Sequence, residues 1–155
     1  MAFRTSWRFT WAVTTGAVFE PWQLELIAET RRAVLGTIAA DGRPHLVPVC
    51  FALVDHTFGI AIDEKPKRPG RLARLRNIDR DPRVTLLIDR YTDDWRQLAW
   101  LRVDGEATIV QRGGERPELL AALRGSYVQY RAMALEDSPL ILVVPDRVSA
   151  WRWSG

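Results

Sequence analysis

A run of basic residues is the part of the sequence best suited to bind an anion. From Glu64 to Arg83 it holds eight cations and three acids, a net charge of +5 in twenty residues, whereas the whole chain carries only +3. The cations are Lys65, Lys67, Arg68, Arg71, Arg74, Arg76, Arg80 and Arg83. Arginine forks and flexible lysines suit the oxygens of phosphates and carboxylates. Charge alone is equally compatible with such a site and with a solvated basic face.

A proline-containing loop and a short helix would carry these cations. Apolar residues recur at threefold spacing between positions 72 and 78, which predicts an amphipathic helix over 71–79. Arg71 and Arg74 would share one face of its first turns. Free backbone N–H groups and the helix dipole already favour an anion there.

The rest of the pattern is mainly β. Helices are predicted over 21–33 and 115–134, and strands over 33–40, 44–54, 57–63, 83–90, 96–111 and 140–153. Asp41-Gly42 and Asp55-His56 separate the first three strands as turns, an Asp-Gly pair breaks the fifth, and Pro145 predicts a bulge or bend at an edge. Because strands follow one another without a helix between each pair, we expect an antiparallel barrel or a strongly curved sheet. Residues 1–20 would form an extension of uncertain structure, and residues 21–155 one domain.

Other residue types exclude several classes of protein. Cys50 is the single cysteine, so no internal disulfide can form, and its apolar neighbours predict a buried structural thiol. His45 and His56 have no Cys, Asp or Glu at metal-ligand spacing, so no metal site is expected. Phosphate-loop, dinucleotide-binding and serine-nucleophile motifs do not occur, and the sequence names no catalytic residue.

Aromatic and apolar residues narrow the choice of partners. Trp95, Trp100, Trp151 and Trp153 flank late strands and could wall a planar ring, although packing in a core or interface is the other role open to them. Aromatic residues are not interleaved with the basic run, which argues against a nucleic-acid partner. No apolar run approaches the roughly eighteen residues that span a bilayer. We therefore expect a cytoplasmic protein with no membrane partner.

Four stretches of the sequence resemble one known family. They are ADGRPHLVPVCFAL, AIDEKPKRPGRLARLRNIDRDPRVTLLIDRY, DDWRQLAWLRVDGEA and SAWRW. In this order they are similar to the split β-barrel flavin and deazaflavin oxidoreductases related to pyridoxamine 5′-phosphate oxidase, and most of all to the actinobacterial branch that depends on coenzyme F420. The resemblance spans Pro21 to Trp153. It implies a mainly β fold with a few helices, a six-stranded antiparallel split β-barrel, and a homodimer that binds its cofactor in a groove between the subunits.

The resemblance also implies which residues bind the cofactor. The strand matching Leu46–Phe51 would run along the ring, with the N–H groups of Val47 and Val49 donating to its edge because Pro48 has none. The loop and helix matching Lys65–Arg74 would hold the phosphate. The predicted cofactor-binding residues are Leu46, Val47, Pro48, Val49, Ile62, Asp63, Lys65, Lys67, Arg68, Arg71, Arg74, Trp95 and Trp100.

The implied reaction is hydride transfer between F420 and a small organic substrate that the sequence does not identify. The surplus cations beyond Arg74 would suit the oligoglutamate tail of F420, an anion longer than a single phosphate. One alternative is an FMN-dependent oxidase or reductase on the same scaffold. The other is a non-catalytic protein that stores or carries F420 or a flavin.

Overall fold

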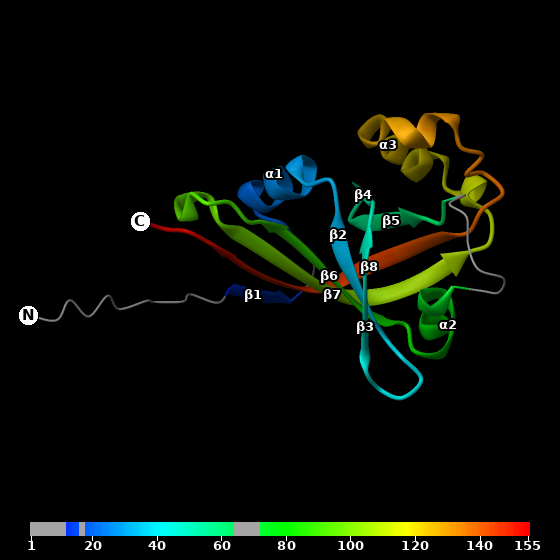
Figure 1. Ribbon diagram of the computed structural model, residues 1–155, viewed down its shortest axis with the longest axis horizontal. Coiled ribbons are helices and arrows are strands. Elements are labelled where there is room, and N and C mark those ends of the chain that lie inside the picture. Colours follow the sequence, from blue (N-terminus) through cyan, green and yellow to red (C-terminus); the bar gives the residue numbers. More distant parts are fainter. Residues whose placement is uncertain (1–11, 16–17, 64–71) are drawn as a thin grey trace, which may run out of the picture.

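Antiparallel strands form one curled sheet in the computed structural model, which describes residues 12–15, 18–63 and 72–155 (Figure 1). The strands are β1 (Ala12–Thr15), β2 (Ala33–Ile38), β3 (Pro44–Val49), β4 (Ala52–Val54), β5 (Thr57–Ala61), β6 (Arg83–Arg90), β7 (Ala99–Val110) and β8 (Leu140–Arg152). The α-helices are α1 (Pro21–Glu29), α2 (Ala73–Arg80) and α3 (Pro117–Ser126). Three short 3₁₀ helices are η1 (Trp95–Gln97), η2 (Gly113–Glu115) and η3 (Val128–Ala132). The predicted mainly β, antiparallel class is confirmed.

The order of the strands shows how the sheet closes. Along the sheet it is β3-β2-β6-β7-β8-β5-β4, with β1 paired to β8 beside this path. β3 and β4 therefore occupy the two ends of the path, yet only Cys50 and Phe51 separate them in the chain. A two-residue link reaches only about 10 Å. The sheet must curl until its two ends almost meet.

The predicted count of six strands is too low. Seven strands lie along the path, and β1 is an eighth. The predicted strand over 44–54 divides into β3 and β4, because the chain leaves one end of the sheet at Cys50 and joins the other at Ala52. Apolar residues continue through that corner, so hydropathy gives no sign of it. β1 lies within residues 1–20, and the domain boundary proposed at residue 21 stays a prediction.

Local sequence signals explain most of the connections. The Asp55-His56 turn has positive φ at both residues (46° and 60°), as a two-residue hairpin turn of this hand requires. Gly42 adopts φ of 82° at the tip of the β2–β3 hairpin. α1 begins with Pro21, and the Glu20 N–H donates to Gln23 Oε1 at 3.0 Å. The helix predicted over 115–134 is shorter, because α3 ends at Ser126 and η3 continues the chain.

Two apolar clusters lie on opposite faces of the sheet. The inner cluster fills the curl with alternate residues of the strands, such as Leu35, Leu86 and Leu101, and with residues of α1 and α2. The second cluster packs α3 and η3 against Ala52, Ala61, Leu140 and Leu142. In Figure 1 α1 and α3 both lie in the upper part of the view, although they pack on opposite faces of the curled sheet, and α2 lies near the β2–β3 hairpin.

The remaining outward surface has no helix over it in the described part of the chain. We call it the outer face and define it by the outward residues of β3, β2, β6, β7 and the second half of β8. Paired strands arrange these residues in rows: Leu46–Gly36–Thr85–Asp104–Arg147, Pro48–Val34–Leu87–Arg102–Ser149 and Asp89–Trp100–Trp151. Leu46 is 65% exposed and Leu87 is 38% exposed.

A β-bulge in β8 depends on a glycine of β7. The β7–β8 register shifts between Asp104, opposite Arg147, and Gly105, opposite Pro145. Asp146 is the extra residue, so the predicted bulge near Pro145 is confirmed. On its other edge β8 pairs with β5 through Val143 and with β1 from Arg147, and residues 144–146 have no described partner strand there. A proline is tolerated at such a local edge because no ladder bond needs its missing N–H.

Replacing Gly105 by alanine should destabilise the fold. A Cβ at this position would lie 2.3 Å from the carbonyl oxygen of Val144, so two backbone segments must separate, at a cost of about 1–3 kcal/mol in the free energy of unfolding. Urea denaturation measures the change.

Gly125→Ala is the matched control. Nothing lies within 4 Å of a Cβ built on this residue of α3, and alanine favours the helix by about 0.5–1 kcal/mol. The two substitutions should therefore change stability in opposite directions, and a Gly105→Ala variant as stable as the parent would contradict the packing described for the bulge.

Candidate functional site

Arg74 is a half-buried cation whose hydrogen-bonding capacity is incompletely used. Its side chain projects from the first turn of α2, and the guanidinium Nε is buried with no hydrogen-bond partner among the described residues. Burial lowers the pKa of this guanidinium, and the nearby Asp63 and Tyr130 partly raise it again. An arginine retains its charge in proteins. The site thus has a fixed cation with one buried donor that no described residue satisfies.

Cys50 and Phe51, which join β3 to β4 and which we call the barrel-closing link, are held by a tyrosine from a distant element. The Tyr127 hydroxyl accepts a hydrogen bond from Phe51 N–H at 3.1 Å and donates one to Phe51 C=O at 3.0 Å. Tyr127 follows α3 directly and is 8% exposed. Both polar backbone groups of Phe51 are thereby satisfied at the point where the chain passes from β3 to β4. The clamp fixes the end of the predicted ring-binding strand.

A cavity of about 750 Å³ opens beside this clamp. Cys50, Asp63, Tyr127 and Tyr130 line it, together with Arg31 and Arg131. Burial and the neighbouring Cys50 raise the pKa of the Tyr130 hydroxyl, and burial raises the pKa of Tyr127. Both tyrosines are therefore neutral at physiological pH. Cys50 is half-buried: it packs against the second apolar cluster and also lines this cavity, so it is less buried than its apolar neighbours predict.

The register of β3 decides which of its backbone groups face outward. Ala39 N–H donates to Arg43 C=O at 2.9 Å, and pairs in the same phase include Leu35–Val47 and Ala33–Val49. In an antiparallel ladder these pairs exchange their hydrogen bonds with each other, and the alternate residues point theirs away. The N–H groups of Val47 and Val49 are therefore directed at β2. A ring at the open edge of β3 would find Leu46 N–H as the donor, because Pro44 and Pro48 have none.

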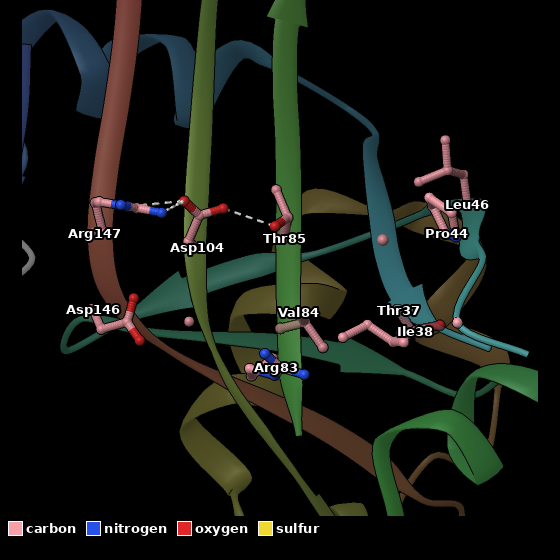
Figure 2. A pocket seen from close by; sticks show the side chains of 13 residues that line it. Thr37, Ile38, Pro44, Leu46, Arg83, Val84, Thr85, Asp104, Asp146 and Arg147 are labelled. Carbon is pink, nitrogen blue, oxygen red and sulfur yellow. Dashed lines mark hydrogen bonds and ion pairs between the residues drawn. The ribbon is translucent and has the colours of Figure 1, made fainter. Parts of the chain in front are cut away.

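A polar network crosses the outer face at the row of Asp104 (Figure 2). Thr85 donates its hydroxyl to Asp104 Oδ1 at 2.7 Å, and Arg147 Nε donates to Asp104 Oδ2 at 3.2 Å. Arg102 Nε lies 3.7 Å from the same oxygen. The network borders a shallow cavity of about 540 Å³, into which the bulge also turns Asp146. Both signs of charge meet there, so the cavity does not favour an anion in the way that Arg74 does.

The two predicted tryptophans lie away from β3. Trp100 shares a cavity of about 440 Å³ with Trp151 and Leu87, and Trp95 is 60% exposed on η1. β2 and β6 separate β7 from β3, and Trp100 is four residues along β7 from the row of Leu46. Standard strand spacings place the two on the order of 20 Å apart. One copy of the chain does not bring these tryptophans to the ring strand.

The other predicted residues divide between buried, exposed and undescribed positions. Val49 and Ile62 are buried, Val47 and Asp63 are half-buried, and Pro48 is exposed beside Leu46. Lys65, Lys67, Arg68 and Arg71 lie outside the described residues. Sequence reasoning missed Tyr127, Tyr130, Arg31 and Arg131. In the sequence Tyr127 and Tyr130 stand three residues apart after the residues of α3, and this spacing indicates only that both rings pack on one side.

The described part of the chain contains neither a cluster of metal-binding side chains nor a membrane-spanning helix. None of its groups of histidine, cysteine, aspartate and glutamate reaches three residues placed to hold a metal ion. None of its helices has the length and apolar character needed to cross a lipid bilayer.

Comparison with known proteins identifies the family. The chain matches pyridoxamine 5′-phosphate oxidase over residues 19–152 and belongs to that family. No curated protein sequence matches the chain.

Solved structures share the fold at low identity. A conserved hypothetical protein from Mycobacterium tuberculosis has a TM-score of 0.69 and 21% identity, with 87% of this chain and 86% of that chain covered. The heme storage protein HutZ of Vibrio cholerae has a TM-score of 0.65 and 20% identity, with 86% and 93% covered. A protein described as an F420 reductase has a TM-score of 0.59 and 22% identity, with 84% and 98% covered.

Replacing Leu46 by proline tests the register of β3. This variant removes an N–H that makes no ladder bond, and the side chain is largely exposed, so the free energy of unfolding should fall by no more than about 1 kcal/mol. Val47→Pro is the matched control, because it removes an N–H directed at β2 and should cost at least about 2 kcal/mol. Thermal and urea denaturation report both values. Equal losses in the two variants would show that the N–H directions are misassigned.

Proposed function

We propose that the protein is an F420-dependent oxidoreductase that binds the deazaflavin between two copies of the chain. Arg74 carries the proposal, because its buried Nε has no partner among the described residues and its charge is fixed. A phosphate oxygen is a suitable acceptor for that donor. The membership of the pyridoxamine 5′-phosphate oxidase family supports a phosphorylated, ring-bearing ligand.

The described residues fit such a cofactor at two points. Arg74 would bind the phosphate, and Leu46 N–H would donate to the ring edge at the open side of β3. When bound, the deazaflavin supplies two-electron hydride transfer. The chain itself orients the ring and excludes water, which requires no acid–base pair. The barrel-closing link holds the ring strand in place while this happens.

The surplus of cations favours F420 over FMN. Arg74 and Leu46 would serve either cofactor, since both have a ring and a phosphate. Lys65, Lys67, Arg68 and Arg71 remain in the sequence after Arg74 is assigned. F420 has a carboxylate-rich tail beyond its phosphate, and FMN has none. An FMN-dependent oxidase or reductase is therefore the second candidate, and a carrier without catalysis is the third.

A second copy of the chain is the proposed partner. The outer face exposes Leu46 and Leu87, and Tyr91 and Trp95 extend from its end with 78% and 60% exposure. Exposed apolar surface of this extent marks interaction sites. The outer face carries both positive and negative side chains, so the same face of a second copy can pair with it. We propose a homodimer, active in the cytoplasm, in which the outer faces pack together.

Titration with both cofactors tests the proposed activity. We expect F420 to bind more tightly than FMN at low salt, and the difference to narrow as salt screens the tail. Arg74→Gln should weaken binding of either cofactor by roughly 1.5–3 kcal/mol, or about ten- to a hundredfold in Kd. Cofactor fluorescence reports the affinities. Leu46→Pro should also weaken binding of either cofactor, because it removes the proposed N–H donor to the ring and leaves Arg74 in place.

Arg76→Gln is the matched control for Arg74. Arg76 is exposed on the same helix, two residues further along, so its loss should change affinity by a smaller factor. If Arg74→Gln and Arg76→Gln bind F420 as the parent does, the phosphate site is elsewhere. Protein purified with stoichiometric FMN, or tighter binding of FMN at low salt, would favour the second candidate.

Light scattering at micromolar concentration tests the dimer. We expect a dimer whose interface buries upwards of about 2,000 Å² in total. Leu87→Glu places a charge in the centre of the outer face and should shift the protein to a monomer. Leu24→Glu is the control, because Leu24 is 45% exposed on α1 and lies outside the outer face. A monomeric parent protein, or a dimer that survives Leu87→Glu, would rule out this interface.

A further inference from the structure

We infer that the cavity beside the barrel-closing link is a second anion site, which binds the carboxylate of an organic ligand. It measures about 750 Å³, within the usual range of small-molecule sites. Cys50 and Asp63 place it next to the end of β3 and the start of the basic segment. This inference extends the proposed function, because a ligand there would lie beside the proposed cofactor.

Two arginines from separate elements give the cavity its charge. Arg31, between α1 and β2, donates from Nη1 to the carbonyl oxygen of Ser126 at 2.9 Å. Arg131, on η3, donates from Nε to the carbonyl oxygen of Arg124 at 3.1 Å. Each bond uses one of the five N–H donors of a guanidinium and fixes its orientation. Both arginines line the cavity, so their other donors can hold a carboxylate.

The remaining walls do not oppose an anion. Among the described residues that line the cavity, Asp63 is the single acid, and Arg74 is close enough to interact with it. Tyr127 and Tyr130 are neutral, because burial raises the pKa of both hydroxyls. Their rings lie 5.5 Å apart at an angle of 54° and form a rigid aromatic wall. The cavity therefore suits a flat organic body that carries a negative group.

The carboxylate can come from either of two ligands. One source is the glutamate tail of the cofactor, and the other is a substrate with its own carboxylate. Either carboxylate would bind to Arg31 and Arg131. The experiment therefore has one arm for each source.

The first arm uses 2-naphthoate and its neutral amide as probes of the protein without cofactor. Ligand-observed NMR should show that the carboxylate binds the parent more tightly than the amide. Arg31→Gln and Arg131→Gln should each weaken binding of the carboxylate by roughly three- to tenfold and leave the amide unchanged. Arg112→Gln is the matched control, since Arg112 pairs with Asp137 away from the cavity and its loss should change neither probe.

The second arm compares F420 that carries several glutamates with the form that has none. A selective loss of affinity for the glutamate-bearing form in Arg31→Gln and Arg131→Gln would assign the site to the tail. Unchanged affinity for both forms, with the loss seen only for 2-naphthoate, would assign it to a substrate carboxylate. If neither arm distinguishes the two variants from Arg112→Gln, the inference is wrong. If the parent binds no F420, the cofactor proposal fails, and the naphthoate arm still decides the anion site.

Discussion

The two-residue link between β3 and β4 is the constraint on which the rest of the structure depends. Cys50 and Phe51 join strands at opposite ends of the sheet. A chain that turns so sharply cannot pair its own backbone with a neighbouring strand, and buried N–H and C=O groups left without partners are costly. Tyr127 supplies both partners through one hydroxyl. The same contact closes the barrel, fixes the end of β3 and forms one wall of the cavity.

The curl also decides how the surfaces are used. Alternate residues of each strand face the interior, and α1 and α2 complete that core. α3 covers the outward residues of β4, β5 and the first half of β8. The outer face is left with leucines and tryptophans beside a network centred on Asp104. A sheet that is covered on one half of its outward surface and bare on the other is suited to assembly through the bare half.

Local patterns in the sequence predict most of the fold, whereas contacts distant in the chain escape them. Turn residues at Gly42 and His56, and the threefold spacing before Arg80, indicate elements that the structure contains. The corner at Cys50 is invisible, because the residues around it remain apolar and a strand and a corner can both be apolar. Arg74 could be singled out by its neighbours in sequence. Arg131 could not, because its proposed role depends on η3 and Cys50 lining the same cavity.

β8 has a consequence for the synthesis of the protein. It pairs with β7 along its length and with β5 and β1 on its other edge, so it supplies the hydrogen-bonded connection of β1, β5 and β4 to the rest of the sheet. A ribosome makes β2 to β7 before it reaches residue 140. Until then the apolar surfaces that will meet across β8 are exposed to water, a state in which nascent chains aggregate and need chaperones. A truncated protein that ends before β8 would form separate pieces of sheet rather than a smaller barrel.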